Sequence, residues 1–564
     1  MKGKKIFALA LACTIAATSY SGVHVFAAEK TVVSQSIATE SATLVKNTQY
    51  GAVLGTTKAN SNVWYSIPYA AAPVGSLRWS APIDPQSWSD VLDCTKAGNT
   101  AIQAGTDYST GETVISGSED CLNLDVYAPN NASNLPVLVY IHGGNNQTGT
   151  SSEIEGSQIV VDENCVYVSL NYRLGLLGFN ALPAFQTEAD STGNYAMLDI
   201  AKALDWVRAN IAEFGGDPDN ITVSGFSAGG RDVMAMLISP VFEGKFDKAI
   251  VYSGGMTVAD EDNSAEIIAE AVAPLAVEDG VCADEATAKE WLLSDDQAVV
   301  AYLKGIDATR LCTLMANAGI RMSVFPHLYK DDVVIPSAGF DTKKYNSVPI
   351  LMLTGETEFS LFSAFDGYFY SPAMTSLDTT TQNLAKSFAI EYGSDMYRIF
   401  NAQCSAEKMF ANYKDSIYIC QVRYGSKNSA TQIPLMGSFH GIFVPMLTDN
   451  HSYGSFADFS NAGYQNMAGV FDGYLRNFLV SGNPNGEELT AWDKWSPSNP
   501  VSLVLDADDT NAIVTLEDTS SSYKEIIGRM QADTIISDEV KDLMIDHILN
   551  GRWFSATLDE TYGN

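Results

Sequence analysis

The sequence contains few positive charges. Its 564 residues include 33 Lys and Arg against 67 Asp and Glu, a formal net charge of −34. A chain this acidic repels phosphate backbones, so we expect no nucleic acid among its partners. After the first thirty residues no run of 18 consecutive apolar residues occurs, so no transmembrane segment is expected in the mature chain.

Disordered composition and metal-binding patterns are also missing. Apolar residues make up 46% of the chain and charged residues 18%, and no internal segment is repeated or low in complexity, so we expect a folded core. There is no Cys-x-x-Cys and no cluster of His and Cys, which argues against a metal site. We expect the activity to require no cofactor.

The first 27 residues are typical of a secretory signal peptide. A lysine-rich start precedes the apolar run Ile6–Ala17, and Val25-Phe26-Ala27 carries small side chains before a cleavage point. Lipid attachment at Cys13 is the weaker alternative, because the apolar run before Cys13 is short and continues past it. Cleavage after Ala27 removes three lysines and no acid, so the net charge goes from −34 to −37. We therefore expect a secreted or cell-envelope protein.

Export permits disulfides. Seven of the 8 cysteines remain without Cys13, an odd number, so at least one should be a free thiol. Cys94 and Cys121 bracket a polar, Gly-rich segment, where a disulfide would stabilise the fold by about 3 kcal/mol. Cys165, in an apolar strand-like run, is expected to be a buried thiol. Proximity along the chain suggests two other pairs, Cys404–Cys420 and Cys282–Cys312.

Strand-like and helix-like segments alternate in the first half of the chain. Two apolar runs, 137–141 and 165–171, read as strands. A helical stripe follows, formed by Met197, Ala201, Leu204, Val207 and Ile211. We expect that helix to end at Gly215, a turn at 217–220, and a short strand at 221–223. This alternation predicts a parallel sheet covered by helices.

The strongest chemical signal is Gly225-x-Ser227-x-Gly229, between an expected strand and an expected helix over 233–238. A sharp turn at this point exposes the serine hydroxyl, and the glycines prevent clashes in the strained geometry. Upstream, the glycine-rich stretch His142-Gly-Gly-Asn145 follows a strand. Its backbone N–H groups can approach a substrate closely enough to stabilise a developing oxyanion.

A serine nucleophile needs a base and an acid. Of the histidines outside the signal peptide, the oxyanion loop and the C-terminal stripe, His327, His440 and His451 remain, and we favour His440 because small residues flank it. Glu356 and Glu358 both stand at the end of the expected strand 349–353. The order serine, acid, histidine is typical of α/β-hydrolases.

These motifs resemble the type-B carboxylesterase family, the cholinesterase-like branch of the α/β-hydrolases, over nearly the whole mature chain. The resemblance implies the α/β-hydrolase fold: one large domain over residues 28–564, with a central, mostly parallel sheet covered by helices on both faces. It replaces the three or four domains that length alone suggests. The tail 517–564 is expected to pack on this domain or to form an interface. Other matching stretches are Ile67-Pro-Tyr-Ala70, Ser118-Glu-Asp-Cys-Leu-Asn-Leu124, Asn171-Tyr-Arg-Leu-Gly175, Ser253-Gly254 and Gly482-Asn-Pro-Asn485.

The resemblance also implies residue roles. Ser227 would be the nucleophile, His440 the base and Glu358 the orienting acid, with Glu356 as the alternative acid. The oxyanion hole would be formed by the backbone N–H groups of Gly144, Asn145 and Ala228. The resemblance supports the disulfide Cys94–Cys121 and favours Cys282–Cys312 as a second one.

Three departures from the family pattern concern the same site. The third glycine of the oxyanion loop is Asn145, which tolerates left-handed backbone but narrows the site. Phe226 replaces the polar residue, often Glu, that usually precedes the nucleophile. No Trp lies between Cys94 and Cys121 to hold a quaternary ammonium, so choline esters are not favoured, although Tyr108 offers a weaker substitute.

We therefore expect a secreted serine hydrolase that cleaves small-molecule carboxylic esters through an acyl-enzyme. Two alternatives stay open. One is a cholinesterase-like binding or adhesion protein without catalytic activity, which Asn145 and Phe226 support. The other is the same triad acting on amides or as a transacylase.

Overall fold

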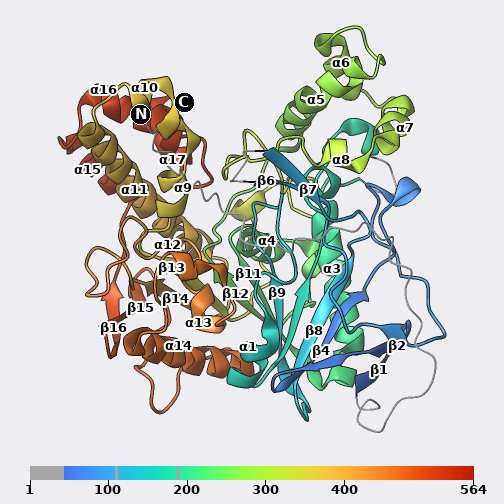
Figure 1. Cartoon of the computed structure of the whole chain (residues 1–564), viewed down its shortest axis with the longest axis horizontal. Coiled ribbons are helices and arrows are strands. Elements are labelled where there is room, and N and C mark those ends of the chain that lie inside the picture. Colours follow the sequence, from blue (N-terminus) through green and yellow to red (C-terminus); the bar gives the residue numbers. More distant parts are fainter. Residues whose placement is uncertain (1–43, 108–111, 187–190, 564) are drawn as a thin grey trace, which may run out of the picture.

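A large mixed β-sheet runs through the centre of the molecule (Figure 1). The computed structural model describes residues 44–107, 112–186 and 191–563, so the expected signal peptide and Tyr108 lie outside the described residues. From β10 to β15 all neighbouring strands are parallel, and antiparallel strands flank them on both edges. In spatial order the eleven strands are β16 (Ala512–Asp518), β15 (Val501–Ala507), β14 (Ile417–Val422), β13 (Ile350–Gly355), β12 (Lys248–Tyr252), β11 (Gly216–Phe226), β9 (Leu135–Ile141), β10 (Val166–Leu170), β8 (Asn123–Pro129), β4 (Ser61–Pro68) and β3 (Thr56–Lys58).

Helices cover both faces of this sheet because its strands are apolar on both sides. Along β9 the side chains of Val137, Val139 and Ile141 enter one core, while Leu138 and Tyr140 enter the other. The first core contains buried residues of α3 (Tyr195–Asn210), and the second contains those of α14 (Ala462–Ser481). The doubly covered, mostly parallel sheet predicted from the sequence is confirmed.

The prediction of a turn at residues 217–220 is wrong. These residues lie inside β11, where the pairing with β9 jumps from Gly216 to Ile221. An irregularity of this kind lets polar residues leave the ladder without ending the strand. The α-helix before it, α3, ends at Asn210, and Ile211 begins a short 3₁₀ turn.

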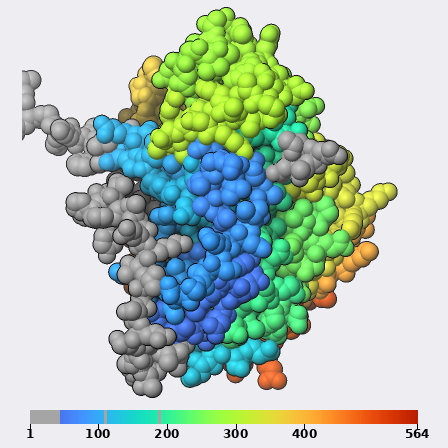
Figure 2. Space-filling model, turned by 90° about the vertical axis from the view of Figure 1, so that its right-hand side faces the viewer, coloured from blue at the N-terminus to red at the C-terminus, as the bar shows by residue number. Residues whose placement is uncertain are grey.

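Two groups of helices stand beyond the carboxyl edge of the sheet, at the top of Figure 1. One group forms the yellow-green top of the face shown in Figure 2. It consists of α5 (Glu261–Glu278), α6 (Glu285–Leu292), α7 (Gln297–Gly305) and α8 (Ala308–Leu311). The other contains α9 (Ser360–Ala364), α10 (Pro372–Thr375), α11 (Thr379–Asn401), α15 (Tyr523–Ala532), α16 (Asp538–Met544) and α17 (Ala556–Tyr562).

The C-terminal segment belongs to this second group, which packs around a third hydrophobic core. Ile526, Met544 and Trp553 are buried together with residues of α11. None of the described helices is long and apolar enough to span a membrane. The remaining elements are small: α1 (Gly156–Asp162), α2 (Gly175–Gly178), α4 (Ala228–Met236), α12 (Gln403–Phe410), α13 (Val444–Leu447), β1 (Val45–Thr48), β2 (Gly51–Leu54), β5 (Leu92–Asp93), β6 (Gln103–Asp107) and β7 (Glu112–Ser116).

The structure contains no disulfide among its described cysteines. Cys94 and Cys121 are both buried in the same core, so their pairing stays a prediction. Cys165 is also fully buried, at the start of β10, and burial raises the pKa of its thiol well above the usual range.

A buried ion pair fixes the loop that follows β10. Arg173 donates from Nε and Nη2 to the two carboxylate oxygens of Asp199 on α3, both at 2.7 Å. Both side chains are almost fully buried. Because the guanidinium and the carboxylate meet at two points, the loop has one orientation relative to α3.

We expect Asp199→Asn to lower the free energy of unfolding by about 3–5 kcal/mol, because it leaves the buried Arg173 cation without a counter-charge. The control is Glu243→Gln, which removes the exposed ion pair with Lys344 and should cost less than about 1 kcal/mol. Urea unfolding of the two variants measures the difference. Equal losses would contradict the role assigned to the buried pair.

Candidate active site

Ser227 occupies a sharp turn between β11 and α4. Its backbone has φ 55° and ψ −115°, a strained conformation for a residue other than glycine. The Ser227 N–H donates to the carbonyl of Tyr252 on the neighbouring strand β12, at 2.9 Å. The turn therefore leaves the ladder at once and presents the serine at the carboxyl edge of the sheet.

Gly225 and Gly229 allow this turn because neighbouring backbone atoms leave no room for a side chain at either position. A Cβ atom on Gly229 would lie 2.2 Å from the carbonyl oxygen of Ile141, and one on Gly225 would lie 2.3 Å from the carbonyl oxygen of Gly229. Neither backbone atom can move away without breaking β9 or α4. The close approach brings α4 against the loop that follows β9.

That loop carries the expected oxyanion donors. Gly144, Asn145 and Asn146 all have positive φ, of 98°, 60° and 55°. The backbone N–H groups of Gly144 and Asn145 donate to no acceptor among the described residues, whereas the carbonyl oxygen of Gly144 accepts from the N–H of Thr148 at 3.0 Å. The Asn145 side chain turns to Gln147, donating to its Oε1 at 2.8 Å.

Buried polar contacts fix this loop against α4. Asn146 donates to Asp232 Oδ1 on α4 at 2.9 Å, and accepts from the hydroxyl of Tyr172 at 2.9 Å. The N–H of Gly143 donates to Glu153 at 2.8 Å. Burial raises the pKa of both carboxyls, Asp232 and Glu153, to about 7.

His440 contacts Glu358 through a short hydrogen bond. His440 Nδ1 lies 2.5 Å from Glu358 Oε2, and both side chains are almost fully buried. The other carboxylate oxygen, Glu358 Oε1, accepts from the backbone N–H of Gly355 at 2.5 Å and from the hydroxyls of Ser253 and Thr354 at 2.5 and 3.1 Å. These donors and the imidazole fix the orientation of the carboxylate.

His440 Nε2 is left available. It is buried and has no hydrogen-bond partner among the described residues. Aromatic rings surround the imidazole: its centroid lies 4.7 Å from that of Phe226, 5.2 Å from Phe362 and 5.5 Å from Tyr397. Phe226 therefore packs against the histidine as an apolar wall where the family pattern has a polar group.

The other candidates are engaged elsewhere. Glu356 forms an ion pair with Arg423 at 3.2 Å. His327 is fully buried, with Nε2 2.6 Å from Nη1 of Arg231, and His451 lies half-buried in a loop. Among the described histidines, only His440 contacts a carboxylate.

Some residues around the site carry no sequence signal of their role. Ser253 belongs to a stretch that matches the family, but its contact with Glu358 joins residues more than a hundred positions apart. Tyr397 carries no motif at all. Phe554, from the C-terminal segment, stacks on Tyr397 with a centroid distance of 4.9 Å. Such contacts leave no local pattern in a sequence.

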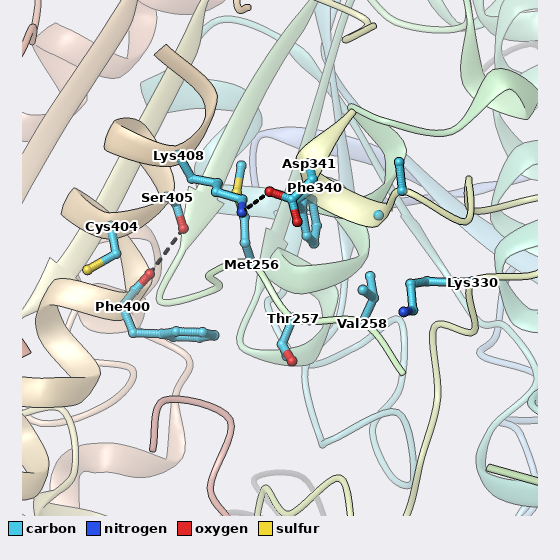
Figure 3. Close-up of a pocket in the computed structure, with 12 residues that line it drawn as sticks. Met256, Thr257, Val258, Lys330, Phe340, Asp341, Phe400, Cys404, Ser405 and Lys408 are labelled. Carbon is cyan, nitrogen blue, oxygen red and sulfur yellow. Dashed lines mark hydrogen bonds and ion pairs between the residues drawn. The ribbon is translucent and has the colours of Figure 1, made fainter. Parts of the chain in front are cut away.

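A cavity of about 300 Å³ adjoins the oxyanion loop. Gly144 and Asn145 line one side of it, and Phe362, which contacts His440, lines another. A second cavity, of about 400 Å³, lies between α12 and the segments 256–258 and 338–341 (Figure 3). Lys408 and Asp341 form an ion pair in it. Ser227, Glu358 and His440 line neither cavity, and only the first is lined by residues of the oxyanion loop. The described residues include no group of three or more side chains suited to a metal.

Comparison with known proteins agrees with this geometry. The model of the carboxylesterase family matches residues 42–388. The chain is 30% identical over 498 residues to the para-nitrobenzyl esterase of Bacillus subtilis, a match that covers 85% of this chain and 97% of that protein.

The chain belongs to the carboxylesterase family. This carboxylic ester hydrolase is also 30% identical over 512 residues to the human cocaine esterase, covering 80% and 86% of the two chains. Its structure is similar to that of a PNB esterase, with a TM-score of 0.63, 27% identity and coverage of 86% and 99%. The α/β-hydrolase fold is thereby confirmed.

We expect the stability of this carboxylesterase to depend on Asp232 in a pH-dependent way. A carboxyl whose pKa is raised in the folded state binds more protons when folded, so its stabilising contribution is full below about pH 4 and is lost as the pH rises through 7. Asp232→Asn keeps the acceptor for Asn146 without the charge. Relative to wild type, the variant should therefore gain roughly 2–4 kcal/mol of unfolding free energy between pH 4 and 8.5.

Thermal and urea unfolding at the two pH values measure this gain. The control is Asp295→Asn, at an exposed position, which should show the same difference from wild type at both. A constant difference for Asp232→Asn would show that its carboxyl does not titrate in this range.

Proposed function

We propose that this protein hydrolyses carboxylic esters through an acyl-enzyme, with Ser227 as nucleophile, His440 as base and Glu358 as the acid that orients it. The observation that supports this most is the 2.5 Å contact between His440 Nδ1 and Glu358 Oε2, with Nε2 left without a partner among the described residues. That arrangement keeps the proton on Nδ1, so Nε2 is the basic nitrogen.

In the first half of the reaction Ser227 Oγ attacks the ester carbonyl carbon while His440 Nε2 takes the hydroxyl proton. The carbonyl oxygen becomes an oxyanion, which the N–H groups of Gly144, Asn145 and Ala228 stabilise; each such donor contributes about 10²–10³ in rate. The tetrahedral intermediate then collapses, the bond to the alcohol oxygen breaks, and His440 gives its proton to the leaving alcohol.

In the second half, water attacks the acyl-enzyme. His440 Nε2 takes a proton from the water, a second oxyanion forms in the same hole, and collapse releases the carboxylic acid and returns the proton to Ser227. Glu358 keeps its position throughout, because its oxygens accept from fixed donors and from the imidazolium that forms twice per cycle.

We expect Ser227→Ala to abolish hydrolysis of p-nitrophenyl esters and labelling by a fluorophosphonate. Glu358→Gln should lower kcat by roughly 10³-fold or more, because the amide can no longer hold the charge of the imidazolium. The matched control is Glu356→Gln, since Glu356 stands two residues away in an ion pair with Arg423; its kcat should stay within a few-fold of wild type.

Steady-state kinetics on esters of increasing acyl length measure these effects and bound the acyl-chain preference. A large loss in Glu356→Gln with little in Glu358→Gln would reverse the assignment of the acid. A folded wild-type protein without turnover on any of these esters would favour a binding protein instead.

We also propose that the protein is exported, on the basis of the lysine-rich start and apolar run in residues 1–27. Expressed with its full sequence in a bacterial host, it should be recovered outside the cytoplasm with Ala28 as its first residue. N-terminal sequencing of the recovered protein measures this. A chain that keeps Met1, or that begins with a lipid-modified Cys13, would contradict cleavage after Ala27.

A further inference from the structure

The cavity beside the oxyanion loop contains more positive than negative charge. Its charged lining residues are Arg321, Arg552 and Asp366. This is unusual for a chain with a formal net charge of −34. A local excess of positive charge therefore needs an explanation from the contacts of each residue.

Asp366 is neutralised by Arg552. Arg552 Nη2 donates to Asp366 Oδ2 at 2.6 Å, and the other carboxylate oxygen accepts from the N–H of Tyr368 at 2.9 Å. Arg552 Nε also donates to the carbonyl of Ile548 at 2.8 Å. Asp366 is therefore paired directly with Arg552, and each of its carboxylate oxygens already accepts one hydrogen bond.

Arg321 forms no direct ion pair within the described part of the chain. Its Nη2 donates to the carbonyl of His547 at 2.9 Å and its Nε to that of Asn550 at 3.4 Å, so its hydrogen-bond partners are neutral backbone oxygens. Its side chain is half-buried, and burial lowers the pKa of its guanidinium more than the charges of Asp366 and Asp559 raise it. A cation in this position is stabilised less well than one that contacts a carboxylate directly.

The two guanidinium groups converge on one point of the cavity wall. A Cβ atom added to Gly319, whose φ is +59°, would lie 3.0 Å from Arg552 Nη1 and 3.3 Å from Arg321 Nη1. Burial and the neighbouring Arg321 charge lower the pKa of Arg552 to about 10. Two like charges this close repel each other, and an anion between them would relieve the repulsion.

The shape of the site favours a carboxylate. Arg321 Nη1 donates to no acceptor among the described residues, so it can donate to a carboxylate oxygen, and a charged acceptor makes that hydrogen bond stronger. Every nitrogen of Arg552 already donates, Nη1 to the carbonyl of Gly319, so Arg552 contributes its charge. The cavity volume of about 300 Å³ suits a small molecule. One end of the cavity is formed by the oxyanion loop, where the ester carbonyl must lie if the proposed function holds.

We propose that Arg321, assisted by Arg552, binds a free carboxylate on the ester substrate, so that the enzyme prefers small esters carrying a second, ionised acid group. This inference rests on the proposed function, because it names the substrate class of the same site. Such substrates are half-esters of dicarboxylic acids, or hydroxybenzoic acids that are acylated on the phenol oxygen and keep a free carboxylate. The net negative charge of the chain slows their approach, and Arg321 favours them once they are bound.

Two matched pairs of substrates test this. In 4-nitrophenyl hydrogen adipate and its methyl ester, the carboxylate is present or blocked in the acyl part. In 4-acetoxybenzoate and its methyl ester, it is present or blocked in the alcohol part. We expect the ratio of kcat/KM for the charged ester to that for the neutral one to exceed one in at least one pair.

Arg321→Gln should lower that ratio about tenfold or more, the usual effect of losing a charge-assisted hydrogen bond. Arg321→Lys should recover part of it, because lysine keeps the charge but not the paired donors. The control is Arg476→Gln on α14, which removes a guanidinium that also donates to a backbone carbonyl, that of Asp162, outside the cavity; it should keep the wild-type ratio.

A second measurement needs no variant. Adipate should inhibit hydrolysis of a neutral ester by the wild-type protein competitively, and the uncharged adipamide should inhibit it far less. A wild-type ratio of one or less in both pairs, a ratio unchanged in Arg321→Gln, or equal inhibition by adipate and adipamide would each overturn the inference.

Failure of the inference can be told apart from failure of the proposed function. If the wild-type protein hydrolyses the neutral esters and is labelled at Ser227 by a fluorophosphonate, the proposed function stands whatever the charge ratio. If it hydrolyses neither member of either pair and is not labelled, both proposals fall together.

Discussion

The close approach of two backbone segments underlies the candidate site. The first turn of α4 passes so near the end of β9 that Gly229 has no room for a side chain beside the carbonyl of Ile141. Three things follow from this contact: the strained turn at Ser227, the position of the oxyanion loop, and the hydrogen bond between Asn146 and Asp232. A parallel sheet makes the contact possible, because β9 and β11 end at the same edge and their following loops must meet there.

The sequence predicts the parts of this arrangement that have local patterns. Apolar runs and a helical stripe predicted the sheet and α3, and the glycines around Ser227 predicted a turn whose φ is indeed positive. The turn expected at 217–220 failed, because Asp, Pro and Asn favour turns while pairing with β9 on either side keeps the segment in a strand. The sequence could not predict contacts between residues that are distant along the chain. No local pattern near Tyr397 indicates that it stacks on His440, and none near Ser253 indicates that it donates to Glu358.

The buried carboxyl groups of this protein have different hydrogen-bond partners. Asp199 has a bidentate arginine, Glu358 has several neutral donors and a histidine, and Asp232 has one amide. Arg321 differs from these groups: it is a half-buried cation whose hydrogen-bond partners are neutral, and it lines the cavity beside the oxyanion loop. Such a cation does not stabilise the fold. Its position in the same cavity as the oxyanion loop therefore points to a role in binding.

The aromatic and basic wall of the site is contributed by a segment far from the nucleophile in the chain. Arg552 lines the cavity, Trp553 covers the guanidinium of Arg231 at 4.0 Å, and Phe554 stacks on Tyr397 behind His440. During synthesis β9, β11 and the turn at Ser227 emerge long before these three residues do. Ser227 is therefore made early and the aromatic and basic residues around the site late, so a nascent chain that has folded only its first half carries the serine without these surroundings.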